Sequence, residues 1–135
     1  MPGGEVATSP GIVSGSFRAD GGAFLPDGSV LRTPLRLVFE RGVLVDVEGH
    51  GRERVLDAVD ADLDGRRIGQ IAFGTNTNVL TPIGAMLQDL KMPGCHLVLG
   101  YTCPELTGAT WTSSVMVPLV CRRPDVTADG EPLMV

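Results

Sequence analysis

The stretch that decides the fold is LRLVFERGVLVDVE, residues 35–48. Leu35, Leu37 and Phe39 alternate with other side chains, and after the pair Arg41-Gly42 the valines at 43, 45 and 47 alternate in turn. A period of two is typical of a strand that buries one face. Two such runs joined by a short turn with glycine predict an antiparallel β-hairpin with one buried face.

The elements on either side of this hairpin are predicted to be short. Val55, Leu56, Val59 and Leu63 recur at helical spacing, so we expect an amphipathic helix over residues 52–63 that ends at Gly65. Leu-Pro-Asp-Gly-Ser-Val, residues 25–30, carries the turn signature of another hairpin. We also expect strands over residues 12–17, 67–74, 96–100 and 114–121, a second helix over 82–90 and a final hairpin of 126–128 against 132–135.

The composition agrees with a single α+β domain over residues 1–135, with a mainly antiparallel or mixed β-sheet and two short helices. The chain is 43% hydrophobic but only 4% aromatic, so its core is aliphatic. The 18 glycines and 10 prolines favour short strands and tight turns over long helices. Pro118 interrupts the apolar run of residues 114–121, so we expect that strand to be an edge strand or a bulged one.

Charge and cysteine content restrict the class of partner. The formal net charge is −5, and basic residues never cluster beyond a pair, so no nucleic-acid partner is expected. Three cysteines without a C-x-x-C motif favour reduced thiols and a cytoplasmic protein. No apolar run approaches the ~18 residues of a membrane span, so no membrane partner is expected.

The candidate chemistry centres on DLKMPGCHLVLGYTCPE, residues 89–105. His96 stands at the mouth of a predicted strand, between a glycine turn and a glycine exit, where a ligand or a proton-transfer group is often placed. A half-buried histidine that donates to a backbone carbonyl is the alternative. Glu5 is the carboxylate we pair with it as an acid/base group, and a carboxylate bonded to turn amides or to an arginine is the alternative.

Four stretches of the chain also match a known pattern when they are taken in order. They are PGGEVATSP (residues 2–10), the glycine-rich region with Ser14-Gly15, IGQIAFGTN (residues 68–76) and DLKMPGCHLVLG (residues 89–100). Together they resemble the C-terminal, metal-binding domain of the M29 aminopeptidases (the aminopeptidase T group) and of the related 2,5-dihydroxypyridine 5,6-dioxygenases. The resemblance implies that the family's N-terminal domain is lacking here, so we expect a homo-oligomer or a heteromer with a chain that supplies it.

The resemblance implies two divalent metal ions in the peptidases, but this chain keeps few of their ligands. Glu5 and His96 match two of them, whereas Gln70 replaces a glutamate by a neutral amide. The stretch SSVMVPL, residues 113–119, has neither member of the family's C-terminal His-x-Asp pair. We therefore expect a degenerate site without a metal cofactor. If one divalent ion (Zn, Mn, Co or Fe) is bound, Glu5 and His96 are its predicted ligands.

Six residues are candidates for binding a small-molecule substrate around this site. Asn76 has the alternative role of fixing its own loop, and Trp111 that of a core residue. Cys103 stands closer than Tyr101 to the position at which the family has a tyrosine ligand. For each cysteine, the alternative to a functional role is a small buried thiol. Adjacent strand residues point to opposite faces, so Cys95 and His96 are not expected to form a dyad. The six are Gln70, Asn76, Tyr101, Cys103, Trp111 and Ser114.

Three functions follow as hypotheses. The first is a small-molecule enzyme of specialised metabolism or biosynthesis, which performs hydrolysis, cyclisation or isomerisation with Glu5 and His96. The second is a non-catalytic ligand-binding or partner subunit. The third is a true M29-like metal-dependent aminopeptidase or ring-cleaving dioxygenase.

Overall fold

The computed structural model describes residues 5–8, 10, 13–74, 94–122, 126–128 and 131–133. In this part of the chain the fold is α+β, with mainly antiparallel strands and two helices, as predicted. The elements in chain order are β1 (Glu5–Thr8), β2 (Gly15–Ala19), β3 (Gly22–Phe24), β4 (Val30–Leu31), β5 (Leu35–Glu40), β6 (Val43–Glu48), α1 (Arg52–Val59), β7 (Ile68–Gly74), β8 (Gly94–Gly100), α3 (Pro104–Thr107), β9 (Met116–Arg122), β10 (Val126–Ala128) and β11 (Glu131–Leu133).

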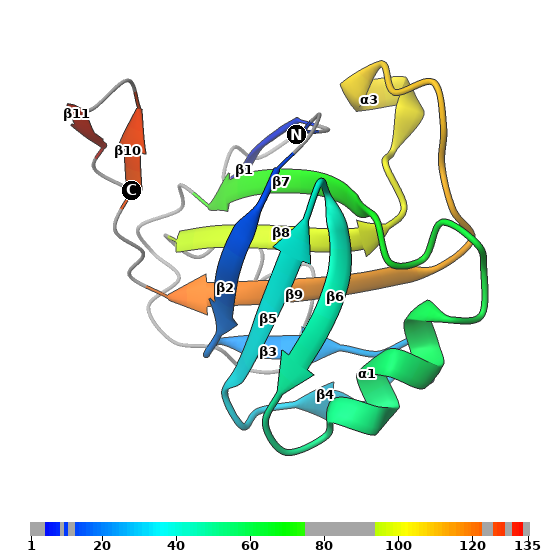
Figure 1. The fold of residues 1–135 in the computed structure, drawn as a ribbon. Helices are drawn as coiled ribbons and strands as arrows, with labels where there is room; N and C mark the ends of the chain where they lie inside the picture. The colour runs from blue at the N-terminus through cyan, green and yellow to red at the C-terminus, as the bar shows by residue number, and fades with distance from the viewer. Residues whose placement is uncertain are drawn as a thin grey trace.

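Two sheets form the body of the molecule. The larger sheet has six strands in the order β1-β7-β8-β9-β3-β4, and the smaller has three in the order β2-β5-β6. The smaller sheet crosses over the middle strands of the larger one, and α1 lies beside the end of the pair formed by β5 and β6 (Figure 1). The strands β10 and β11 form a separate antiparallel pair, which confirms the predicted final hairpin.

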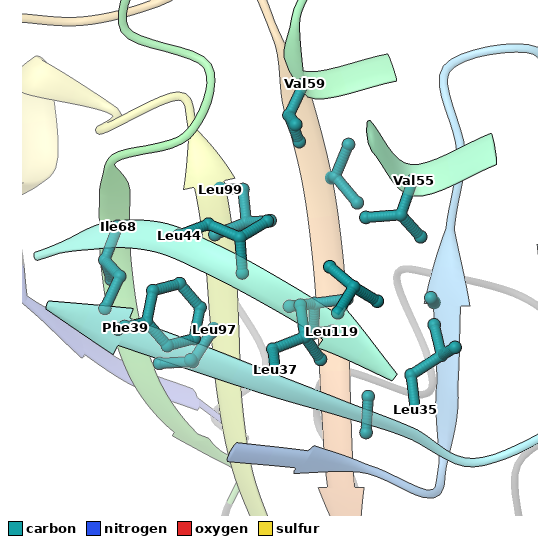
Figure 2. Close-up of a cluster of buried hydrophobic side chains, with 14 of the residues drawn as sticks. Leu35, Leu37, Phe39, Leu44, Val55, Val59, Ile68, Leu97, Leu99 and Leu119 are labelled. Atoms are coloured by element: carbon teal, nitrogen blue, oxygen red, sulfur yellow. The ribbon is translucent and has the colours of Figure 1, made fainter. Parts of the chain in front are cut away.

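The hydrophobic core fills the space between the two sheets (Figure 2). It is aliphatic, as the composition indicates, and each fully buried leucine stabilises the fold by about 1.5–3 kcal/mol. Val55 and Val59 extend it from α1, whose buried face they form. Leucines and one phenylalanine supply the largest side chains of the rest: Leu35, Leu37, Phe39 and Leu44 from the smaller sheet, and Leu97, Leu99 and Leu119 from the larger one.

The hairpin of residues 35–48 is confirmed, but the alternation in its second strand is interrupted. A bulge lies opposite Val38 and Phe39. It brings Leu44 and Val47, three positions apart, into the core, while Val43 and Val45 are 37% and 46% exposed. The strict alternation of the valines in the sequence therefore does not identify the buried face, because the extra residue reverses it.

The interior position of β9 corrects the sequence-based interpretation of Pro118. This strand lies between β8 and β3, not at an edge. Gly21 N–H donates to the Val120 carbonyl, so Val120 and Pro118, two residues apart, both direct their main-chain polar groups toward β3. The pairing with β3 stops at Leu119. Pro118 is tolerated because it lies past the last residue of β9 that pairs with β3, where no N–H is needed for the ladder.

The helices differ from the prediction in extent. α1 ends at Val59, four residues early, and Leu63 is fully exposed in the turn that follows. A Cβ on Gly65 would lie 1.9 Å from the Val59 carbonyl oxygen, so this glycine permits a close chain reversal and is not a helix cap. The predicted helix over 82–90 lies outside the described residues, whereas α3, which opens with Pro104, was not predicted.

The remaining elements follow the prediction closely. β3 and β4 pair as the expected hairpin around Pro26 and Asp27, while the first predicted strand begins at Gly15 rather than at residue 12. β7 and β8 cover the strands expected over 67–74 and 96–100. Among the described residues, no helix has both the length and the apolar character needed to cross a membrane.

Candidate functional site

A β-bulge in β7 decides which way Gln70 faces. The register shifts between Ile68 and Gln70, so two residues of β7 oppose one residue of β8. Ile68 and Ile71 both pack toward the core, and Gln70 consequently turns to the opposite side. Gly69 is required at the bulge, because a Cβ there would lie 2.4 Å from the Tyr101 carbonyl oxygen.

His96 lies on this same side of the larger sheet. Its strand neighbours Leu97 and Leu99 belong to the core cluster, so His96 and Val98 point away from it. His96 pairs with Ala72 of β7, while Gln70 pairs with Val98, which makes Gln70 and His96 diagonal neighbours. We call this side the outer face of the larger sheet, defined by Gln70, Ala72, His96, Val98 and Val120.

The outer face is closed to solvent at these positions. His96 has no exposed surface and Gln70 is 7% exposed. Cys95 lies on the other side of β8, so the two adjacent residues face apart, as expected from strand geometry. The imidazole of His96 is therefore a fully buried polar group on this face.

Glu5, the predicted partner of His96, lies in β1. It pairs with Gly74 of β7, which in turn pairs with Gly94 of β8. One strand therefore separates the two residues, and His96 is two positions further along β8. With strand spacing and rise per residue at their usual values, the two Cα atoms are about 12 Å apart. The side chain of Glu5 and the whole of Asn76 lie outside the described residues.

The other predicted substrate residues gather at the far end of β8. Tyr101 follows the strand, five residues or about 16 Å from His96. The amide of Gln70 connects the two regions, because its Nε2 donates to the Tyr101 carbonyl over 3.1 Å. The next residue, Thr102, is fully buried, and its hydroxyl donates to the Trp111 carbonyl over 2.7 Å.

A small polar cluster forms around the turn that leads into α3. Cys103 has φ of 50°, a left-handed conformation, and its thiol lies 3.5 Å from Oε2 of Glu105. The pKa of the Tyr101 hydroxyl is raised, first by its hydrogen bond with Cys103 and then by the negative charges of Cys103 and Glu105. Tyr101 and Cys103 therefore interact with each other, and their substrate-binding role stays a prediction.

One face of the Trp111 ring is covered by the side chain of Arg67. The guanidinium carbon of Arg67 lies 3.6 Å from the centre of its ring, a cation–π contact, and Arg67 also pairs with Asp64 over 3.4 Å. Ser114 is exposed. Its neighbour Ser113 is buried, and the hydroxyl donates to Asp62, which holds the pKa of that carboxyl below its usual value.

Sequence reasoning missed the contacts of Arg67 and Thr102, and it named Ser113 only as a residue that could line a pocket with Trp111. Arg67 was assigned only to the start of a strand, and the buried hydroxyls resemble any loop threonine or serine in the sequence. Arg67 stacks on Trp111, and Ser113 bonds to Asp62, 51 positions away in the chain. No local signal in the sequence identifies pairs that lie so far apart.

The donor set of a two-metal centre is not found in the described part of the chain. No three of its histidine, cysteine, aspartate or glutamate side chains are grouped to hold an ion. The amide nitrogen of Gln70 is bonded to Tyr101, and an amide brings no charge to offset dehydration of a divalent ion. A single ion held by Glu5 and His96 remains a prediction, because the carboxylate of Glu5 lies outside the described side chains.

Comparison with known proteins finds a solved structure with a similar fold. No family model and no curated protein matches this chain. The chain is similar to the solved structure of 2,5-dihydroxypyridine dioxygenase from Pseudomonas putida KT2440, with a TM-score of 0.68 and 18% sequence identity. The match covers 90% of this chain but 38% of the dioxygenase chain. It shows a related fold, in agreement with the dioxygenase side of the resemblance found in the sequence.

Proposed function

We propose that this chain is an enzyme of small-molecule metabolism in which His96 is the acid/base group. The observation that carries the proposal is the fully buried imidazole on the outer face of the larger sheet, diagonal to Gln70. The likeness of the fold to a dioxygenase of a hydroxylated pyridine supports a small, polar, aromatic substrate.

Glu5 is the second acid/base group in this proposal. The two Cα atoms are about 12 Å apart, and because His96 has no exposed surface, a small substrate reaches both groups only when the outer face opens. One group accepts a proton from the substrate while the other donates one. Such paired transfer serves hydrolysis, cyclisation or isomerisation, and each of these proceeds without a redox step.

Gln70 acts as a positioning residue. Its donation to the Tyr101 carbonyl holds the loop of Tyr101 and Cys103 against the start of β7. Tyr101, Cys103, Trp111, Ser114 and Asn76 remain the proposed substrate-binding residues. The first two are already in contact, and Trp111 is joined to the same loop through Thr102.

The test uses 2,5-dihydroxypyridine and a panel of related hydroxypyridines as probes. Each is incubated with the full chain, with and without added Fe(II), Mn(II), Co(II) or Zn(II), and followed by proton NMR of the small molecule. We expect conversion by the wild type and a loss of at least ~100-fold in His96→Gln, the usual scale for a general acid or base. His50→Gln is the matched control, because His50 is exposed in a turn.

A second candidate is a ligand-binding or partner subunit without catalysis. It is favoured by the hydrogen bond that the Gln70 amide donates to the Tyr101 carbonyl, which occupies that polar group. The same NMR experiment separates this candidate from the enzyme, since a binding subunit shifts the resonances of the probe without converting it. Absence of both binding and conversion across the panel contradicts either function for hydroxypyridines.

The third hypothesis, a metal-dependent aminopeptidase or ring-cleaving dioxygenase, is tested by metal content. More than one equivalent of Zn, Mn, Co or Fe in the purified chain would support it. A cytoplasmic location and an oligomer, either of this chain alone or with a chain carrying an N-terminal domain, complete the proposal. Light scattering at working concentration tests the homo-oligomer, and a monomer contradicts it.

A further inference from the structure

We propose that Cys95 and Cys121 form a site of reversible oxidation, closed as a disulfide across β8 and β9. The two residues occupy directly opposed positions in the ladder of these strands. All three cysteines of the chain are thiols in the structure, but Cys103 lies in the turn before α3. The site is independent of the proposed acid/base chemistry.

The register places the two thiols on one side of the sheet. Gly21 N–H donates to the Val120 carbonyl, so the main-chain polar groups of Cys121, one residue on, face β8. Cys95 and Cys121 are therefore a hydrogen-bonded antiparallel pair, whose Cα atoms are about 5.5 Å apart. That separation lies inside the range of roughly 4.4–6.8 Å found for disulfides.

The spacing of the pair decides how easily the bond closes. Within the described residues, one further pair, Gly94 with Arg122, follows it in the ladder. Directly opposed Cβ atoms are about 4.5–5.5 Å apart, slightly more than a relaxed disulfide needs, so the two strands must draw together locally. A strained disulfide is readily reduced again, so the oxidation is reversible.

The surroundings of Cys95 and Cys121 raise the pKa of both thiols, so both are mostly protonated at neutral pH. Both are half-buried, and burial raises the pKa of each. Asp20 adds negative charge near Cys121 and raises its pKa further, and Arg18 acts in the opposite direction. Asp20 is itself held in place, because its Oδ1 accepts the Arg122 N–H over 2.7 Å.

The reaction needs a disulfide of low molecular weight, such as oxidised glutathione. One cysteine thiolate attacks a sulfur of glutathione disulfide, which breaks that S–S bond and releases one glutathione. The second cysteine thiolate attacks the protein sulfur of the mixed disulfide and releases the other glutathione. The two cysteines are oxidised, glutathione disulfide is reduced, and the two thiol protons end on the released glutathiones.

The experiment incubates the reduced chain with oxidised glutathione and measures its mass after the free thiols have been alkylated. We expect a species that has lost two hydrogen atoms, carries no glutathione and keeps one alkylatable thiol. Cleavage after Glu105 leaves Cys121 on a different peptide from Cys95 and Cys103, and cleavage after Tyr101 separates Cys95 from Cys103. The cross-linked peptides must contain Cys95 and Cys121, and dithiothreitol must release them.

The variants make the assignment specific. Cys103→Ser is the matched control and must still form the bond, whereas Cys95→Ser and Cys121→Ser must not. A chain that takes up glutathione on Cys95 or Cys121 but never closes the bond overturns the proposal. So does a cross-link that maps to Cys103, or a chain that stays fully reduced while its denatured form oxidises under the same conditions.

Discussion

Arg67 lies with its guanidinium 3.6 Å from the centre of the Trp111 ring, across a separation of 44 positions in the chain (111 minus 67). The contact joins the start of β7 to the segment that returns from α3 to β9. Trp111 is the chain's only tryptophan, so its fluorescence reports directly on this junction.

Removing the cation is predicted to loosen that junction. Arg67→Ala should lower the free energy of unfolding by about 1 kcal/mol, because it removes a partly desolvated cation–π contact. It should also shift the emission of Trp111. Urea unfolding followed by fluorescence measures both effects. Arg52→Ala is the control, since its ion pair with Asp46 is exposed and 4.0 Å long, and an equal effect in both variants would contradict the prediction.

Gly69→Ala should be among the most destabilising single substitutions in the chain. The new Cβ would lie 2.4 Å from a backbone oxygen that cannot move independently, so the bulge or the Tyr101 turn must shift. We expect a loss of at least ~2 kcal/mol by chemical denaturation. Gly108→Ala is the comparison, because its φ of 72° costs about 1 kcal/mol but its Cβ meets open space. Equal losses would show that steric contact at the bulge is unimportant.

Gln70→Glu restores the residue type that the family resemblance implies, and we expect it to destabilise the chain at neutral pH. A buried carboxylate cannot donate to the Tyr101 carbonyl and is costly to desolvate, so its pKa should be raised. The variant should therefore be nearest to wild-type stability below the ordinary glutamate pKa of about 4.3, and lose stability as pH rises through the raised value.

Thermal unfolding between pH 4 and pH 8 measures this dependence, with Gln70→Leu as the uncharged control. Gln70→Leu lacks the hydrogen bond at every pH, so its deficit relative to wild type should stay constant. A Gln70→Glu variant whose stability rises with pH in the presence of a divalent ion would instead indicate that the outer face binds metal.

The thiol of Cys121 is predicted to react slowly in the folded chain. Its pKa is raised to about 11, first by burial and then by Asp20 and Cys95. Its thiolate fraction at pH 8 is therefore about 100-fold below that of a thiol with the reference pKa of 9.0. Iodoacetamide labelling of wild type and Asp20→Asn, resolved by peptide mass, measures this, and the variant should label faster.

The same shift has a consequence for stability. A folded-state pKa above the unfolded value means that the contribution of Cys121 is complete below about pH 9 and is lost as pH rises toward 11. Cys121→Ser should therefore flatten the fall in stability over that window. An unchanged alkaline slope in the serine variant would contradict the assignment.

Sequence alone determined the local elements. The alternation in residues 35–48 predicted their hairpin, the Pro-Asp-Gly turn predicted the pairing of β3 with β4, and the scarcity of aromatic residues predicted an aliphatic core. The position of His96 in a strand and its orientation away from Cys95 also followed from alternation. Each of these depends on side chains a few positions apart, and a period of two or 3.6 is visible at that distance.

Tertiary structure alone decided the register between strands. It placed the bulge that turns Gln70 toward His96, made β9 an interior strand despite Pro118, and set Arg67 on Trp111 and Cys95 opposite Cys121. It also separated His96 from the Tyr101 loop by the length of β8. These relationships join residues far apart in the chain. They are set by how whole strands bury their apolar faces together, which no local pattern of residues encodes.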